Sequence, residues 1–288
     1  MHDVGLRESL RMENRHESRP DTLSVTGHRP YALPKRPWRM TQRWRDLLFA
    51  HWPIPPEALA SLIPSGLEID TFDRSAWIGV VPFWMDRVQM RGMPRIPGAS
   101  RFPELNLRTY VRERNTNRAG IYFFCLEAAS PLAVAVARTA FHLPYHWARM
   151  SIRQRSEREF TYQSERILSR RPVRFRAHYR GLGQMRQLGS SRPGTIEHFL
   201  TERYCLYTTN RRGELLQGDI HHEPWPLELA EAEIEINDLP ATYGIQLPDT
   251  APLLHYSREL VAYAWTPEQA GLSRLKALEA AAARPAEV

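Results

Sequence analysis

Apolar and polar residues alternate along much of the chain between residues 39 and 265, which is the period of strands that bury one face. Runs of this kind predict strands at 40–52, 67–73, 75–90, 104–114, 120–126, 150–154, 158–164, 174–181, 204–209, 214–222 and 253–260. Helical segments are predicted at 55–64, 133–140, 196–203 and 270–283, and proline-imposed turns between the last two strands. This excess of strands predicts an α+β fold, mostly antiparallel β-sheet curled into a cone or barrel around a pocket, with a few short helices.

The centre of this pattern is a junction between a helix and a strand. Ala133–Ala140 is small and apolar, which predicts a short buried helix. Pro144 lacks a backbone donor and disfavours helical angles in the residue before it, so the helix is expected to end near Phe141. The chain then runs extended through Tyr145 and His146. Such a junction either presents these side chains at the mouth of a pocket or is a core junction with aromatic residues at its edge.

The pattern also divides the chain into three parts. Residues 1–36 are charged and nearly free of aromatic residues up to residue 29, which predicts a disordered or weakly ordered tail. Residues 37–265 contain the predicted strands and form one domain. Residues 266–288 are expected to form a helical tail. The segment 91–103, rich in proline and glycine, predicts a loop over a site.

The charge changes this picture only slightly. Of 39 basic residues only Lys35 and Lys276 are lysines, and the formal net charge is +7. Acidic residues are interleaved with the arginines and no nucleic-acid motif is present, so we expect no nucleic-acid partner. Arginine stays protonated and cannot serve as an amine nucleophile. Chemistry that needs a lysine is therefore nearly excluded by composition.

Cysteines and apolar runs indicate the compartment. Cys125 and Cys205 show no paired spacing, which fits core residues in a reducing environment. No apolar run is long enough to span a bilayer, and the N-terminus lacks an apolar signal core. These features predict a soluble cytoplasmic protein without a membrane partner.

The predicted strand at 104–114 carries the first candidate binding residues. Asn106, Arg108 and Tyr110 share one face by the two-residue period, and the opposite face is apolar at Leu105 and Leu107. The planar guanidinium of Arg108 suits a carboxylate or phosphate, which predicts an anionic small-molecule ligand. The alternative is a strand arginine that is exposed to water or paired with a nearby acid.

Three further residues, Tyr145, His146 and Glu202, are candidates for chemistry, and Tyr204 is a further candidate for substrate binding. Tyr145 and His146 are expected to act in proton transfer, since histidine titrates near neutral pH. Glu202 comes directly after the helical residues IEHFLT (196–201) and leads, through Tyr204, into a strand, so both are expected to project into the pocket. A carboxylate shielded from water has a raised pKa, which suits acid–base catalysis. Alternatively, His146 is a buried structural histidine and Glu202 pairs with an arginine.

No metal site is predicted. His142 and His146 are four residues apart, but Pro144 between them prevents the helical geometry that would bring them together. His221 and His222 are adjacent on a predicted strand and so face opposite sides. We expect neither a metal nor another cofactor.

Several of these segments together resemble a known family. Residues 47–83, 102–111, 120–128, 137–151, 196–207 and 220–227 resemble the YqjF-like family of uncharacterised proteins, within the acetoacetate decarboxylase-like superfamily. The resemblance implies a β-sheet cone around a closed pocket. Decarboxylases of that superfamily form a Schiff base through a lysine in a Gly-aromatic-Pro-Lys-Lys motif. The matching segment here is HLPYH, with Tyr145 in the place of that lysine and His146 in the place of its neighbour.

The resemblance and the composition together lead to a functional hypothesis. The protein is expected to bind or convert a small organic acid or carbonyl compound without a Schiff-base lysine, because neither lysine lies near the matching segments. The alternative is a non-catalytic ligand-sensing or interaction module. A homo-oligomer is compatible with either function.

Overall fold

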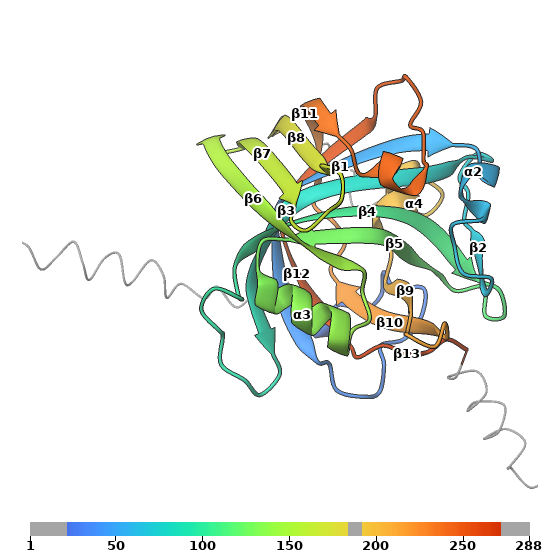
Figure 1. The fold of residues 1–288 in the computed structure, drawn as a ribbon. Coiled ribbons are helices and arrows are strands. Elements are labelled where there is room, and N and C mark those ends of the chain that lie inside the picture. The colour runs from blue at the N-terminus through green and yellow to red at the C-terminus, as the bar shows by residue number, and fades with distance from the viewer. Residues whose placement is uncertain (1–21, 184–191, 272–288) are drawn as a thin grey trace, which may run out of the picture.

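The computed structural model describes residues 22–183 and 192–271. Its strands are β1 Met40–Ile54, β2 Leu67–Ile69, β3 Ala76–Met90, β4 Phe102–Glu113, β5 Ala119–Ala128, β6 Tyr145–Ser156, β7 Glu159–Arg166, β8 Arg174–Gly181, β9 Cys205–Thr209, β10 Leu215–His222, β11 Leu227–Asn237, β12 Leu253–Ala264 and β13 Glu268–Gln269. Its helices are α2 Glu57–Ala60, α3 Pro131–Ala140 and α4 Ile196–Thr201, with 3₁₀ turns η1 Thr22–Ser24 and η2 Pro240–Tyr243. The predicted fold class, a curled sheet with few short helices, is confirmed (Figure 1).

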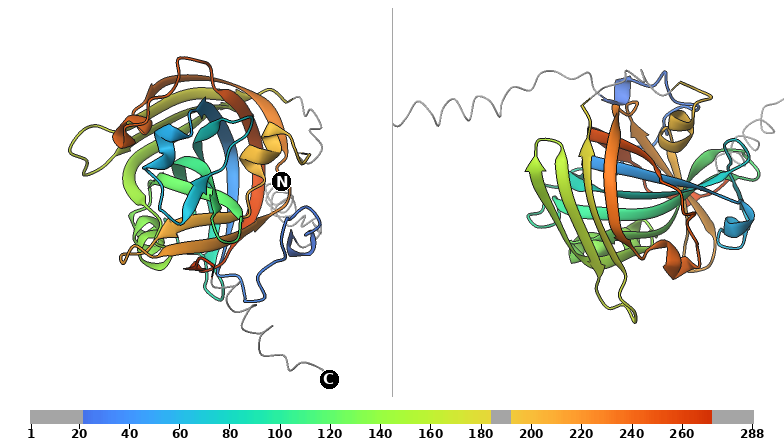
Figure 2. Two further views of the ribbon diagram at one scale, coloured as in Figure 1. Left: turned by 90° about the vertical axis from the view of Figure 1, so that its right-hand side faces the viewer. Right: turned by 90° about the horizontal axis from the view of Figure 1, so that it is seen from above.

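The strands close into two rings. Nine strands form a barrel in the order β5-β6-β7-β8-β11-β12-β1-β3-β4, which closes through the β4–β5 pair (Figures 1 and 2). A second ring of seven strands closes through the β10–β12 pair and contains β9 and β10 together with five barrel strands, β12, β1, β3, β4 and β5. Most pairs are antiparallel, but β5 pairs in parallel with β6 and with β9. The five shared strands therefore form a wall between two interiors.

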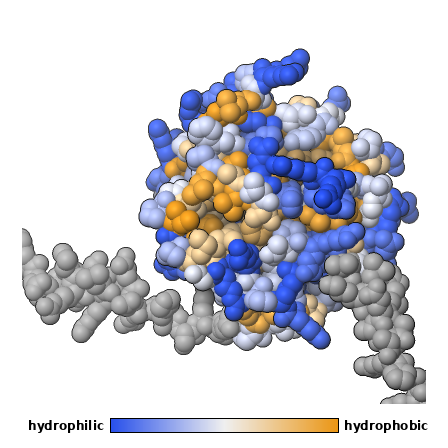
Figure 3. Space-filling view, turned by 60° about the horizontal axis from the view of Figure 1, so that its bottom comes forward, coloured by the Kyte–Doolittle hydropathy of each residue, from blue (hydrophilic) through white to orange (hydrophobic). Residues whose placement is uncertain are grey.

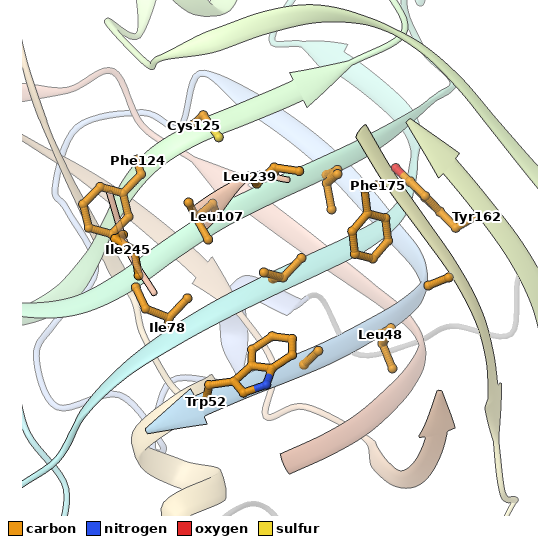
Figure 4. Packing of buried hydrophobic residues seen from close by; sticks show 14 of the residues in the cluster. Leu48, Trp52, Ile78, Leu107, Phe124, Cys125, Tyr162, Phe175, Leu239 and Ile245 are labelled. Atoms are coloured by element: carbon orange, nitrogen blue, oxygen red, sulfur yellow. The ribbon is translucent and has the colours of Figure 1, made fainter. Parts of the chain in front are cut away.

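Each interior has its own apolar core, formed by opposite faces of the shared wall. The nine-stranded barrel is filled by one cluster, which includes Leu48, Ile78 and Leu107 from β1, β3 and β4 (Figure 4). The seven-stranded ring is lined by a second cluster, which includes Phe49 and Val81 from two of the same strands. Burying a leucine or phenylalanine side chain contributes about 1.5–3 kcal/mol. Burial on both faces thus holds the wall in place.

Two local predictions are corrected. Turns imposed by Pro224 and Pro226 were expected in the segment 221–234; residues 223–226 do lie between two strands, but Leu227–Asn237 forms the unpredicted strand β11, which pairs with β8 and β12. The helix α3 was expected to be buried, yet Val134 is its one buried residue, because α3 packs on the outside of β5 and β6. Its end agrees with the prediction, since the amide of Phe141 donates to the carbonyl of Ala137 and β6 begins at Tyr145. The helix predicted over 270–283 lies largely outside the described residues.

The described part of the predicted N-terminal tail packs on the seven-stranded ring. The Nη1 of Arg29 donates to the carbonyl of Ile220 over 2.7 Å, and its guanidinium lies 4.8 Å from the ring centre of Tyr204. The indole of Trp265 donates to the carbonyl of Arg36 over 2.8 Å. Residues 22–36 of the predicted tail therefore pack against the ring, and the division of the chain at 36 and 265 remains a prediction. In the described ranges, no helix is long and apolar enough to cross a bilayer.

Replacing Arg29 by alanine tests this packing. The change leaves the partly buried carbonyl of Ile220 without the hydrogen bond that Arg29 donates, so we expect the free energy of unfolding to fall by about 1–3 kcal/mol. Urea denaturation of the full chain measures it. Arg149→Ala is the control, because that side chain is 80% exposed and its loss should change stability by less than about 0.5 kcal/mol. Equal stabilities of the two variants would show that the packing of the N-terminal segment contributes nothing.

Candidate functional site

A cavity of about 120 Å³, the inner cavity, lies inside the seven-stranded ring. Its wall is mainly apolar and includes Val81, Phe83, Met85, Phe123, Leu126 and Trp225. A smaller set of polar residues also lines it, among them Glu104, Asn106, Arg108, Tyr145 and Arg203. An apolar hollow with a few polar groups is the usual form of a ligand site.

Three of these polar residues follow one another along β4. Glu104, Asn106 and Arg108 point to the same face by the two-residue period, and their exposed fractions are 2%, 4% and 7%. The residues between them, Leu105 and Leu107, face the core of the nine-stranded barrel. The face predicted to carry Arg108 is thus as buried as the apolar face, because the second ring covers it.

The two arginines of the inner cavity differ in their partners. Arg203 is neutralised by Asp70, with 2.6 Å between Nη1 and the carboxylate, and its Nε donates to the carbonyl of Phe199. Arg108 makes no ion pair with any carboxylate of the described residues. Its guanidinium lies 5.4 Å from the ring centre of Phe49, and its Nε is buried without a hydrogen-bond partner. Arg108 is therefore the cation that remains available to a ligand.

Further polar groups surround Arg108. The Nε2 of His51 hydrogen-bonds the hydroxyl of Tyr110 over 2.6 Å, and its Nδ1 is buried without a partner in the described structure. Burial, and secondarily the charge of Arg108, lowers the pKa of His51 well below its usual value, so this imidazole is neutral at neutral pH. The Oδ1 of Asn106 is also buried and unpartnered. Buried polar atoms normally have partners, so the unpartnered Oδ1 of Asn106, which lines the inner cavity, leaves a hydrogen bond for a bound molecule or water to make.

Glu104 lies at the other end of the three β4 residues Glu104, Asn106 and Arg108, and it is a neutral acid. The hydroxyl of Tyr145 donates to its Oε2 over 2.7 Å, and no cation lies against it among the described residues. Burial raises the pKa of Glu104 to about 8, so it is mainly protonated at neutral pH. Burial and the neighbouring Glu104 raise the pKa of Tyr145 well above its usual value. The pair can therefore hold a proton and share it with a ligand.

Glu104 was not among the site residues predicted from the sequence. It begins the predicted strand 104–114, and the same two-residue period that selects Asn106 and Arg108 extends back to it. Applying the period over the whole strand would have found it. Its raised pKa could not have been found this way, because the burial comes from distant strands.

Tyr145 and His146 point to opposite faces of β6. Tyr145 lines the inner cavity, whereas His146 lines neither this cavity nor another described one. Burial, with Arg166 and Arg138 nearby, lowers the pKa of His146 to about 4. Only Tyr145 of this predicted pair is therefore in a position to touch a ligand in the inner cavity.

Glu202 and Tyr204 lie elsewhere. Glu202 lines a separate, more open cavity, where it accepts a hydrogen bond from the hydroxyl of Tyr204 and another from the amide of Trp225, at 3.0 Å. The ring of Tyr204 packs against that of His222, with 4.7 Å between ring centres. The structure therefore joins Arg108 and Tyr145 in one cavity and separates Glu202 from them. Tyr110, also a predicted binding residue, is fully buried behind Arg108 and holds His51.

The cysteines and the possible metal ligands offer no further chemistry in the described residues. Cys125 and Cys205 are free and buried, and burial raises the pKa of each thiol to about 12, so neither is a thiolate. Within the described ranges, no group of three or more His, Cys, Asp or Glu side chains is arranged to hold a metal ion. The chemistry available in the inner cavity is therefore proton transfer and anion binding.

Comparison with known sequences identifies relatives. The model of the DUF2071 family, described as an uncharacterized conserved protein, matches residues 41–261. The uncharacterized protein YqjF of Bacillus subtilis (strain 168) is 44% identical over 234 residues, which are 81% of this chain and 93% of the relative.

Comparison with solved structures shows the fold. The enduracididine biosynthesis enzyme MppR, in complex with the condensation product of pyruvate and imidazole 4-carboxaldehyde, has a TM-score of 0.55 at 11% identity, over 81% of this chain and 90% of that one. An acetoacetate decarboxylase-like enzyme from Sphingomonas wittichii RW1 has a TM-score of 0.53 at 12% identity, over 81% and 94%. An acetoacetate decarboxylase has a TM-score of 0.53 at 14% identity, over 87% and 97%. The chain thus has the acetoacetate decarboxylase-like fold.

Replacing Glu104 by glutamine tests its protonation. An unperturbed glutamate titrates near pH 4.5 and Glu104 titrates near 8, so the folded protein holds an extra proton between these values. The free energy of unfolding should therefore fall as pH rises from about 5 to 8, by up to about 1.4 kcal/mol per pH unit. Glu104→Gln should flatten this profile in urea denaturation. Glu165→Gln, at a half-exposed glutamate, should keep the wild-type profile. A profile unchanged by Glu104→Gln would mean that Glu104 is ionised in the folded protein.

Proposed function

The chain belongs to the DUF2071 family, and we propose that it binds a small organic acid in the inner cavity and acts on it by proton transfer. The observation that carries this proposal is the buried guanidinium of Arg108, which has no carboxylate partner in the described structure and shares its cavity with the neutral acid Glu104. Removing a charge from water costs several kcal/mol unless a counter-charge compensates it. A ligand carboxylate supplies that counter-charge and accepts two parallel hydrogen bonds from the guanidinium.

Glu104 provides the chemistry. A carboxyl group with a pKa of about 8 is present in both its acid and its ionised form between neutral and mildly alkaline pH. Its ionised form takes a proton from the carbon beside the carbonyl group of a bound keto acid, and the proton then resides on Glu104. The same proton, or one exchanged with water, returns to that carbon. Tyr145, hydrogen-bonded to Glu104, keeps the carboxyl oriented.

This mechanism needs no imine with the protein. A Schiff base requires a lysine with a lowered pKa, and the described residues that line the inner cavity include no lysine. Tyr145 lies in the segment where the family resemblance would put that lysine. One structural neighbour, the enzyme MppR, has been studied in complex with pyruvate and with a condensation product of pyruvate, which makes pyruvate the natural first probe.

A second candidate function is a ligand-sensing module that binds the acid without changing it. Among the described residues no lysine lines the inner cavity, which is compatible with this alternative as well as with proton transfer. The two functions differ in whether protons of the bound acid exchange with water, since binding alone leaves these protons in place.

Replacing Arg108 by leucine tests the anchor. We expect the affinity for pyruvate to fall at least about tenfold, because hydrogen bonds to a charged group are lost. The free energy of unfolding should change by only about 1–3 kcal/mol, the usual range for one substitution. Calorimetric titration measures the affinity, and Arg149→Leu, on the exposed side of β6, should bind as wild type does. Unchanged affinity in Arg108→Leu would exclude Arg108 as the anchor.

The chemistry is tested with pyruvate in heavy water. We expect the protein to exchange the methyl protons of pyruvate for deuterium, as followed by proton NMR, and Glu104→Gln to abolish this exchange. Borohydride added to the same mixture should leave the mass of the protein unchanged, because no imine forms. A stable adduct on Lys35 or Lys276 would contradict this mechanism. Binding without exchange would favour the sensing module.

A further inference from the structure

A second cavity of about 130 Å³, the outer cavity, adjoins the inner one between α3 and the loop 91–101. Six residues line both cavities: Met40, Gln42, Met85, Ala137, Phe141 and Tyr145. The hydroxyl that contacts Glu104 therefore belongs to a residue that lies where the two cavities meet. One bound molecule can contact the walls of both.

The outer cavity is apolar. Gln42 and Tyr145 are the residues of its described lining that carry polar side-chain groups, and both also line the inner cavity. Met40, Met85 and Met93 contribute unbranched side chains, which adapt to apolar groups of varied shape. No charged side chain lines it among the described residues. The cavity thus suits a hydrocarbon group and offers nothing to a charged one.

Most of the large apolar side chains that are exposed in the described residues line the outer cavity. Seven large hydrophobic side chains are exposed in the described ranges, and four of them line this cavity: Met93, Ile96, Leu132 and Val136, at 47%, 43%, 47% and 38%. Figure 3 shows apolar side chains gathered on the face that is turned toward the viewer. Exposed apolar surface that is concentrated in a hollow indicates a binding site rather than chance.

We propose that the ligand is an organic acid with an apolar tail, whose carboxylate binds Arg108 in the inner cavity and whose tail fills the outer cavity. This inference rests on the function proposed above for Arg108. Phe102, which lines the outer cavity, lies six residues before Arg108 on β4, or about 20 Å along the strand. Even with the reach of the Arg108 side chain, a three-carbon acid bound to its guanidinium is too short to extend to Phe102 in the outer cavity.

The volumes set the size of this ligand. A cavity of 150 Å³ in another protein binds benzene, so the outer cavity of about 130 Å³ accepts an apolar group of roughly six carbon atoms. The inner cavity of about 120 Å³ holds the carboxylate and a few more atoms. Acids of medium chain length therefore fit the two cavities together.

Binding of a series of unbranched acids to the full-length protein tests the proposal. Titration with butanoate, hexanoate, octanoate and decanoate should show affinity rising about threefold to fourfold for each added methylene until the tail fills the outer cavity. Val136→Gln, at a partly exposed position of α3, should bind octanoate many times more weakly and butanoate as wild type does. Leu168→Gln is the matched control, because Leu168 is 94% exposed and outside the cavity.

The outcomes separate this inference from the function it rests on. Equal affinity for butanoate and octanoate in the wild type would overturn the tail site and leave Arg108 as the anchor. Octanoate binding that survives Arg108→Leu but not Val136→Gln would overturn the joint ligand, because the tail would then bind without the anchor. Failure of all four acids to bind would overturn both proposals. Chain-length dependence that is lost in Val136→Gln, with all binding lost in Arg108→Leu, would support both.

Discussion

Along the middle of the five strands shared by the two rings both faces are covered by an apolar core, and the rest of the structure depends on this constraint. A charged side chain buried there loses its hydration, which costs several kcal/mol unless partners compensate it. Glu127 on β5 accepts hydrogen bonds from Ser164 and Arg166, at 2.5 and 3.0 Å. On β4, Glu104 avoids the cost by holding a proton, and Arg108 is the charge that stays uncompensated within the described structure.

Alternation along the chain was enough to predict most strands and the sidedness of β4, because both follow from local geometry. It missed β11, because the turn signal of Pro224 and Pro226 was carried over to the residues that follow. Residues 223–226 do lie between two strands, but LELAEAEIEIN directly after them alternates as a strand does and forms β11. The closure of the rings had no local signal, since it depends on the parallel pairs of β5 with β6 and β9.

The candidate site was predictable only in part for the same reason. Arg108 and Arg203 look alike in sequence, and what distinguishes them is the ion pair of Arg203 with Asp70, 133 residues away. Glu202 lies in a segment bounded by the apolar residues Leu200 and Leu206, which suggested a shielded catalytic acid, yet its carboxylate oxygens accept hydrogen bonds from Tyr204 and from the amide of Trp225. Partners brought by the fold, rather than residue type, decide which polar group remains free for a ligand.

The alternation of β4 between two interiors also constrains how this sequence can change over time. One inserted or deleted residue within β4 would turn Leu105 and Leu107 toward the inner cavity and Asn106 and Arg108 into the apolar core. Variation in this strand is therefore confined to substitutions that preserve the length of the strand. The loop 91–101 has no such double role and can gain or lose residues, so the outer cavity is the part of the molecule in which ligand preference can diverge between relatives while the anchor stays the same.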